Sequence, residues 1–235
     1  MKTYLTELYQ LVENKNRSNV SKFFKTGVGE YAFGDKFIGV SVPHIRTVAI
    51  KYFNQLNFEE LSEILESAIH EERLFALLCL VEKFDQTKEL ETQKSVAKFY
   101  LQEAAKQHIN NWDLVDLSAY KILGEYFFQI NDVHKLYKLA KSKSMWERRI
   151  AVVSTFAFIK RNVMLPTLDV CTILLEDKEN LIHKACGWML REVGKRNKTS
   201  LMEFLELNAH TMPRIMLSYA LEKFNSEEKI YYRNL

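Results

Sequence analysis

The stretch 180-NLIHKACGWMLREVGK-195 repeats its apolar residues with the period of an α-helix. Projected at about 100° per residue, which follows from 3.6 residues per turn, the stretch has one broad apolar face. That face is formed by Leu181, Ile182, Ala185, Cys186, Met189, Leu190 and Val193. The stretch therefore predicts a helix that packs against other helices along most of its length.

The rest of the chain shows the same period and contains few residues that break helices. Only seven Gly and three Pro occur in 235 residues, and four of the glycines lie in the loop 27–39. Helix starts are indicated by Ser41 and Thr211, each shortly before a proline, and by Asn57 before an acidic run. The sequence predicts an all-α protein with helices at 2–14, 17–26, 43–55, 58–67, 70–84, 87–106, 112–128, 132–141, 145–161, 165–176, 180–195, 199–208, 213–224 and 226–232.

Helices of this number and length favour pairs stacked in series over a four-helix bundle. Trp112, Trp146 and Trp188 recur at intervals in the range of HEAT, armadillo and TPR repeats. We expect one domain, residues 1–235, built as an α-solenoid of degenerate HEAT-like helical repeats with a concave basic face. In such folds the concave face is the usual binding surface.

The composition excludes several classes of protein. Hydrophobic residues make up 47% and charged residues 27% of the chain, as in an ordinary globular protein. The N-terminal residues lack the pattern of a signal peptide, and no apolar run is long enough to span a membrane, so we expect no membrane association. Cys79, Cys171 and Cys186 lie far apart in apolar helical patterns, which is typical of reduced cysteines in a cytoplasmic protein.

Motifs for cofactors are missing from the sequence. The six histidines form no HExxH motif and no cluster with Cys, Asp or Glu at the spacing of metal ligands. Glycine-rich phosphate-binding motifs and the GxSxG nucleophile motif do not occur either. We therefore expect neither a metal nor an organic cofactor.

The charge is distributed unevenly along the chain. Residues 141–196 contain eleven Lys or Arg and six Asp or Glu, so this window carries +5. Because the whole chain carries +3, the remainder carries −2. A basic half beside a mildly acidic half indicates an anionic partner, although an uneven surface charge can also be without function.

Trp188 lies off the apolar face of the helix at 180–195. On its own side it is grouped with Lys184, Arg191 and Lys195, so an indole lies in a column of cations. A polyanion with apolar sugar or base surface would cover both the indole and the charges. The alternative is that Trp188 packs against a neighbouring helix while the long cationic side chains reach solvent.

The segment 112–128 places a carboxylate beside an apolar face. Trp112 lies on that face, and Asp116 follows four residues later at its edge. A carboxylate at such an edge needs a hydrogen bond or a cation. The plain structural interpretation is an ion pair with Arg148 or Arg149.

The helix at 145–161 is apolar on nearly all sides. Trp146 and Arg149 share one side of it, and Arg148 points about 100° away. The guanidinium group of either arginine would suit two phosphate oxygens. Cations for phosphates and flat aromatic rings for bases or sugars are the combination expected for nucleic-acid contact.

Several motifs together make the chain resemble a known family. They are FIGVSVPHIR, NNWDLVDLSA, WERRIA, LIHKACGWMLREVGK and HTMPRIMLSYALEKF, in this order. In this combination the chain resembles the AlkD-type DNA alkylation repair family of HEAT-like-repeat DNA glycosylases over about residues 5–225. The resemblance implies an enzyme that excises positively charged alkylpurines, such as 3-methyladenine and 7-methylguanine, from duplex DNA in base excision repair.

The resemblance also implies roles for particular residues. Trp112, Asp116 and Trp188 match the family's active site, and Arg149 and Arg191 match its DNA-contacting arginines. From their placement beside these residues we add Arg148, Lys184 and Lys195 as candidate DNA-binding residues. The expected partner is double-stranded DNA with alkylated bases, with no obligatory protein partner, in a bacterial-type cytoplasm and at the nucleoid during repair.

The chemistry of such a reaction suits a lone carboxylate. An N3- or N7-alkylated purine is already cationic and leaves as a neutral base, so no general acid is needed. Asp116 would stabilise the oxocarbenium-like sugar and orient water, while Trp112 and Trp188 would flank the deoxyribose.

Two departures and two alternatives accompany this interpretation. Ser218 occupies a position where the family motif has a second arginine, and the loop 27–39 matches no DNA-contacting segment. One alternative is a non-catalytic HEAT-repeat protein that binds damaged or branched DNA. The other is a solenoid that binds proteins and whose basic face is only solvated.

Overall fold

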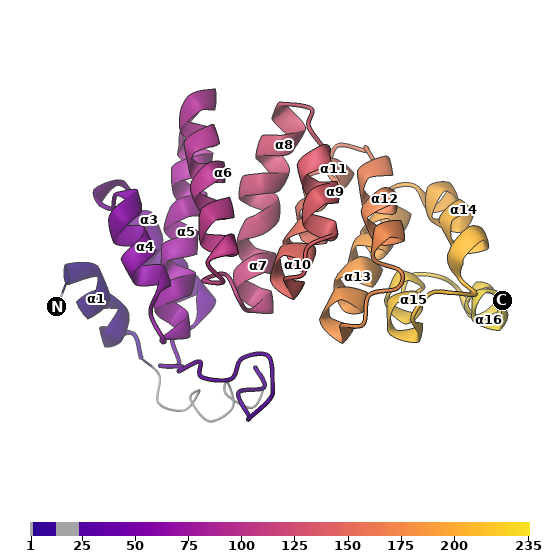
Figure 1. Cartoon of the computed structure of the whole chain (residues 1–235), viewed down its shortest axis with the longest axis horizontal. Coiled ribbons are helices and arrows are strands. Elements are labelled where there is room, and N and C mark those ends of the chain that lie inside the picture. Colours follow the sequence, from indigo (N-terminus) through magenta and orange to yellow (C-terminus); the bar gives the residue numbers. More distant parts are fainter. Residues whose placement is uncertain (1, 13–23) are drawn as a thin grey trace. The chain divides into compact units, whose positions relative to one another are not determined.

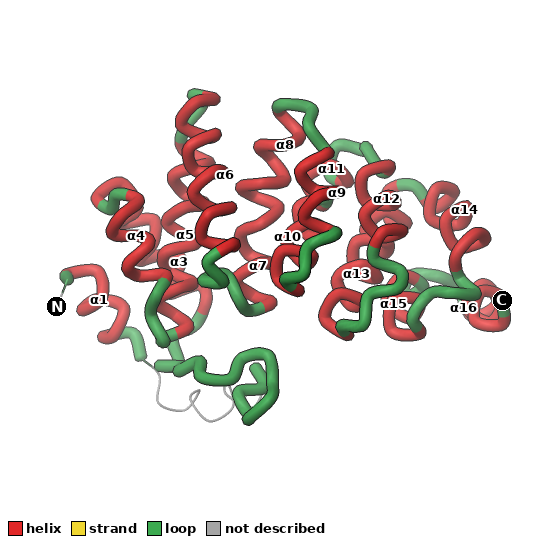
Figure 2. The backbone as a smooth tube through the Cα atoms, viewed as in Figure 1, coloured by secondary structure: helices red, strands yellow, loops and turns green. Residues whose placement is uncertain are grey.

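The computed structural model describes residues 2–12 and 24–235, and the regular elements in these ranges are helices (Figures 1 and 2). One isolated parallel bridge, between Lys36 and Ile69, is the exception within them. The all-α prediction is confirmed, and so is the α-solenoid class. The predicted helix at 17–26 lies mostly outside the described residues, and residues 24–26 are not helical.

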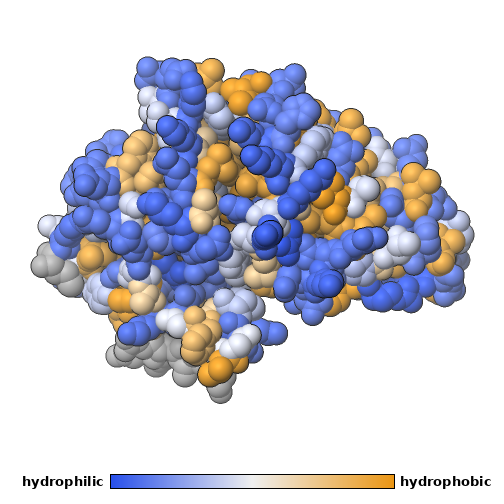
Figure 3. Space-filling view, viewed as in Figure 1, coloured by the Kyte–Doolittle hydropathy of each residue, from blue (hydrophilic) through white to orange (hydrophobic). Residues whose placement is uncertain are grey.

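The chain divides into two compact units, residues 1–118 and 119–235. The single domain over 1–235 stays a prediction. Within the described ranges, no helix is both long and apolar enough to cross a membrane. Hydrophilic side chains cover much of the face shown in Figure 3, and the hydrophobic patches between them are smaller than the hydrophilic areas.

The first unit is organised around one long buried helix. Its helices are α1 (Thr3–Gln10), α3 (Val42–Tyr52), η1 (Phe53–Gln55), α4 (Phe58–Leu65), α5 (His70–Gln86), α6 (Leu90–Ala105) and α7 (Trp112–Ala119), of which α7 ends one residue into the second unit. Helix α5 packs against α3, α4 and α6, and every residue from 70 to 81 is buried. The first four of these residues, 70–73, are polar or charged.

The second unit has α13 as its central helix. Its elements are η2 (Tyr120–Gly124), α8 (Glu125–Gln129), α9 (His134–Ala140), α10 (Met145–Ser154), α11 (Phe156–Ile159), α12 (Leu165–Ile173), α13 (Asn180–Arg196), α14 (Lys198–Asn208), α15 (Arg214–Ala220) and α16 (Ser226–Asn234). Helix α13 packs against α10, α12, α14 and α15. The apolar face predicted for this helix is buried, except for the half-buried Leu181.

Local signals predicted some helix starts better than others. Asn57 forms a capping box with Glu60 at the start of α4, as its position before an acidic run indicates. Ser41 directly precedes α3, although its side chain makes no capping hydrogen bond. Thr211 is not a cap, because α15 begins at Arg214 with Pro213 as its N-cap residue.

Candidate functional site

Trp112 is the first residue of α7 and is half-buried. Its indole stacks on the ring of Phe24, with ring centroids 5.2 Å apart and planes inclined by 14°. Phe24 stacks in turn on Phe37 at 4.8 Å, and Phe37 stacks on the imidazole of His70 at 4.7 Å. We call these four residues the aromatic cluster. It fixes the plane of the Trp112 indole relative to α5.

Asp116 lies one helical turn after Trp112 and is also half-buried, as the projection of the helix predicts. Its negative charge acts on Tyr100, a fully buried residue of α6. Burial is the main reason why the pKa of the Tyr100 hydroxyl lies well above its ordinary value, and the charge of Asp116 raises it further. The Tyr100 hydroxyl is 2.8 Å from that of Ser118, so this part of α7 is joined to α6.

A polar network adjoins the aromatic cluster and shares His70 with it. His70 is 3% exposed and lies between two carboxylates: its Nε2 is 2.7 Å from Oδ2 of Asp113, and its Nδ1 is 3.6 Å from Oδ2 of Asp35. Burial alone would lower the pKa of His70, but the hydrogen bond to Asp113 and the nearby carboxylate of Asp35 outweigh it and raise the pKa above its ordinary value. The structure therefore favours the charged imidazolium.

Arg73 supplies the second cation of this network. Its Nη2 is 2.6 Å from Oδ1 of Asp35, and its Nη1 donates a hydrogen bond to the side chain of Asn110. Asn111 donates to Asp35 at 3.0 Å. Burial would raise the pKa of Asp35, yet His70, Arg73 and Asn111 together lower it. We call Asp35, His70, Arg73, Asn110, Asn111 and Asp113 the polar network.

The polar network holds the start of α7 in place. It joins the loop before α3 to α5 through Asp35, and it joins α5 to the first turn of α7 through Asp113. Glu71 adds to the first junction, because its buried carboxylate accepts hydrogen bonds from the backbone N–H groups of Ile38 and Gly39. Trp112 lies between Asn111 and Asp113, so its position follows from theirs.

The polar network was not predicted from the sequence. Metal-ligand and catalytic motifs relate positions close in sequence, whereas Asp35, His70 and Asp113 lie about 35 and 43 residues apart. A signal was present in 70-HEERLFALLCLV-81, where four polar residues begin a helix whose next eight residues, 74–81, are all apolar. Four consecutive polar residues in such a helix include some that face its buried side, and those need partners.

Trp188 lies on α13 in the second unit and is half-buried. Its ring centroid is 6.2 Å from that of Phe156 on α11, with planes inclined by 40°. The contact with a neighbouring helix, which the sequence left open as an alternative, therefore exists. It leaves part of the indole exposed.

The cations around Trp188 differ in how they are paired. Lys184 is exposed and has no hydrogen bond or ion pair with any described residue. Lys195 pairs with Glu192 at 2.7 Å, and Arg191 pairs with Glu192 and with Glu222 of the following segment. The repulsion expected within the column is thus relieved by acidic neighbours at Arg191 and Lys195, but not at Lys184.

The two arginines of α10 both make contacts within the second unit. Arg148 binds Asp177 through Nε at 2.5 Å and Nη2 at 3.3 Å, and it also donates to the carbonyl groups of Ser142 and Lys143. Arg149 is 5% exposed and donates to the carbonyl oxygen of Leu181. Both arginines therefore join α10 to the segment at the start of α13. A phosphate-binding role for either stays a prediction.

These observations define a class: an all-helical repeat protein with a tryptophan and a carboxylate one turn apart on one helix, and a tryptophan among cations on another. A model of the DNA alkylation repair enzyme family matches residues 4–224, so the chain belongs to that family. Membership implies a DNA substrate and an enzymatic role in the repair of alkylated DNA.

Comparison with individual proteins adds support for the fold alone. A protein described as a predicted DNA alkylation repair enzyme from Enterococcus faecalis has a solved structure that aligns with a TM-score of 0.68. The alignment covers 92% of this chain and 97% of that chain at 15% sequence identity. No curated protein matches the chain.

Proposed function

We propose that this protein is a DNA glycosylase that excises cationic alkylpurines, such as 3-methyladenine and 7-methylguanine, from duplex DNA. The observation that carries the proposal is the placement of Asp116 one turn after the anchored Trp112, in a chain of the DNA alkylation repair enzyme family. A protein that only bound DNA would gain nothing from a half-buried carboxylate, because that charge repels phosphates.

The main requirement of this reaction is electrostatic stabilisation of the positive charge that develops on the sugar. The alkylated purine is positively charged and departs as a neutral base, so the bond to the sugar breaks without prior protonation. Positive charge then develops on the deoxyribose, and Asp116 stabilises it and orients the attacking water. At about 4 Å and an effective dielectric constant of about 20, a carboxylate contributes about 4 kcal/mol to such a charge.

Trp112 and Trp188 assist Asp116 in stabilising the cationic sugar. The face of an indole attracts a cation by about 0.5 to 2 kcal/mol, and a flat ring also excludes water from the sugar. The aromatic cluster stacks on the Trp112 indole and the polar network anchors the residues beside it, and catalysis by a positioned group benefits from such anchoring.

DNA binding is assigned to Lys184, Arg191 and Lys195, with Arg148 and Arg149 as further candidates. Lys184 is exposed and makes no ion pair with the described residues, so it is ready for a phosphate. Arg191 and Lys195 would exchange Glu222 and Glu192 for phosphate oxygens. Ion pairs near the surface contribute only about 0 to 1 kcal/mol, so this exchange costs little.

The test is base release from methylated duplex DNA, followed by chromatography of the free bases. We expect Asp116→Asn to reduce the rate of release by about 100- to 1,000-fold, since about 4 kcal/mol of stabilisation is lost. DNA affinity should stay within about threefold of wild type, because no phosphate contact is removed. The matched control is Glu203→Gln, at an exposed position of α14. Equal rates for Asp116→Asn and wild type would contradict the catalytic role and favour the non-catalytic DNA-binding alternative.

A further inference from the structure

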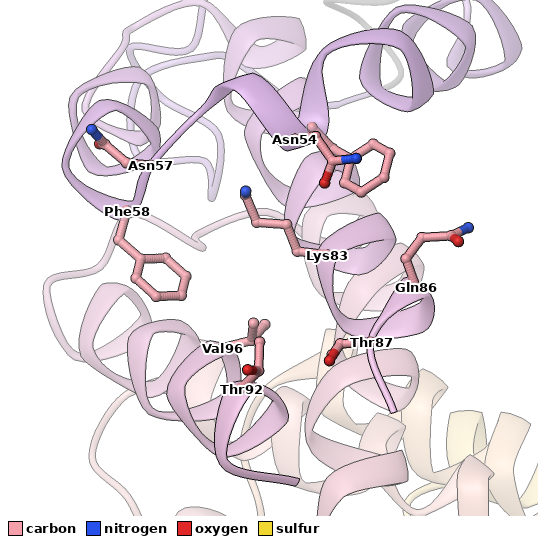
Figure 4. A pocket seen from close by; sticks show the side chains of 9 residues that line it. Asn54, Asn57, Phe58, Lys83, Gln86, Thr87, Thr92 and Val96 are labelled. Atoms are coloured by element: carbon pink, nitrogen blue, oxygen red, sulfur yellow. The ribbon is translucent and has the colours of Figure 1, made fainter. Parts of the chain in front are cut away.

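A cavity of about 540 Å³ lies in the first unit, among η1, α4, α5 and α6 (Figure 4). The described residues that line it are Phe53, Asn54, Asn57, Phe58, Lys83, Gln86, Thr87, Thr92 and Val96. None of them belongs to the candidate site, the aromatic cluster or the polar network. The volume is in the range of pockets that hold small organic ligands, about 300 to 1,000 Å³.

Lys83 is the only charged residue among those that line the cavity in the described chain. It extends from α5 toward the open space in Figure 4, and it makes no hydrogen bond or ion pair with a described residue. Burial lowers the pKa of its amino group, and the charge of Glu60 opposes this only in part. The cavity thus contains a cation whose lost hydration is not replaced by a protein partner.

The cavity also offers a flat apolar surface. Phe58 is 36% exposed, and its ring stacks on Phe99 with centroids 4.9 Å apart. Phe99 therefore holds one side of the Phe58 ring, and Figure 4 shows Phe58 across the open space from Gln86 and Thr87. Val96 and Phe53 add apolar surface to the lining. A ring of the ligand would stack on Phe58 with little loss of side-chain entropy.

The polar lining residues include unused hydrogen-bonding groups. Asn57 and Thr92 are engaged locally, Asn57 in the capping box of α4 and Thr92 with Glu89. By contrast, the side-chain amides of Asn54 and Gln86 have no hydrogen-bond partner among the described residues. They are neutral groups that can complement one polar head but cannot neutralise several charges.

We propose that this cavity binds a small aromatic monoanion, an arene carboxylate or sulfonate, with its anionic group at Lys83 and its ring against Phe58. A single cation matches a single negative charge, whereas a polyphosphate would need several cations that the lining lacks. The ligand is a small molecule and not a nucleic acid. The proposal does not rest on the glycosylase function, and a failure of one leaves the other intact.

The probe for the test is anilinonaphthalene sulfonate, whose fluorescence rises when it leaves water. We expect saturable binding to the full-length protein and at least about tenfold weaker binding to Lys83→Met, because the hydrogen-bonded charge pair is lost. Lys83→Arg restores a cation and should bind within about threefold of wild type. Lys98→Met, at an exposed position of α6 outside the lining, is the matched control and should bind as wild type does.

Competition experiments distinguish the contribution of the ligand's charge from that of its aromatic ring. Naphthoate should displace the probe from wild type at least about tenfold better than the isosteric but neutral naphthamide. Naphthoate affinity should also decrease as pH rises through the pKa of Lys83, and Thr92→Trp should reduce it by filling the cavity. The proposal is overturned if wild type shows no saturable binding, if Lys83→Met binds the probe as wild type does, or if naphthamide competes equally.

Discussion

At the scale of single residues, the charge of His70 is stabilised by the carboxylates of Asp113 and Asp35. The pKa of His70 is raised, so its charged form contributes to stability fully below the unfolded pKa of about 6.5, and this contribution is lost as pH rises through the folded pKa. The pKa of Asp35 is lowered, so its contribution to stability is lost only at acidic pH, as pH falls through its folded pKa. Asp35 thus does not contribute to a change between pH 6 and pH 9, and the difference between a His70 variant and wild type across this range reports on His70.

We predict that His70→Gln lowers the free energy of unfolding by about 2 to 4 kcal/mol at pH 6, because the buried Asp113 loses its cationic partner and Asp35 retains only Arg73. At pH 9 the difference from wild type should be smaller by at least about 1 kcal/mol. Denaturant unfolding at both pH values measures it. His210→Gln, at an exposed position, should show no such pH dependence. An equal difference at both pH values would mean that His70 is not charged in the folded protein.

The residues of the candidate site show which contacts a sequence can predict. Trp112 and Asp116 were found because they lie on one helix, where the spacing alone relates them. Asp35, His70 and Asp113 come from three separate segments, and their contacts arise only when the helices pack. Likewise, Arg191 forms ion pairs with Glu192 and Glu222. The pair with Glu222 could not be predicted by projecting α13 as an isolated helix, because Glu222 lies outside that helix.

At the scale of elements, two glycines of α13 lie at close contacts with neighbouring helices. A Cβ atom at Gly187 would lie 2.5 Å from the carbonyl oxygen of Met216 and 2.5 Å from Cβ of Tyr219, so α13 and α15 touch there along their backbones. A Cβ atom at Gly194 would lie 2.5 Å from Cδ2 of Leu201, the end of a flexible side chain. Both substitutions to alanine gain about 1 kcal/mol in helix propensity.

We predict that Gly187→Ala lowers the free energy of unfolding by about 2 kcal/mol or more, since a backbone carbonyl cannot move aside without shifting α15. Gly194→Ala, on the same helix and with the same propensity gain, should change it by less than about 1 kcal/mol. Thermal or denaturant unfolding of the two variants measures the contrast. Equal effects would show that the α13 and α15 contact adjusts easily.

Element boundaries were predictable where the helical period was uninterrupted, as in α5 and α13. The interruptions were not predictable, because they come from packing. The segment Tyr120–Gly124 is a π-helix within the predicted helix at 112–128, and there a Cβ atom at Gly124 would lie 2.3 Å from the carbonyl oxygen of Ser154. The predicted helix at 145–161 is likewise divided at Thr155, directly after that contact.

At the scale of the whole molecule, the charge distribution makes DNA binding measurable apart from catalysis. The window 141–196 carries +5 and the remainder −2, and Lys184 lies in that window as an exposed cation without an ion pair among the described residues. Each cation that contacts a phosphate releases counterions from DNA, and the affinity therefore falls with salt with a slope of about −0.9 per contact. The slope thus counts contacts that the rate of base release does not report.

We predict that duplex DNA binds wild type with a steep salt dependence, and that Lys184→Ala reduces the slope by about 0.9 and weakens binding equally for all sequences. Fluorescence anisotropy at several salt concentrations measures both effects. Lys98→Ala, an exposed cation outside the basic window, should leave the slope unchanged. An unchanged slope in Lys184→Ala would remove Lys184 from the DNA contacts. A wild-type affinity independent of salt would favour a solenoid that binds proteins, since a phosphate backbone cannot be bound by cations without releasing counterions.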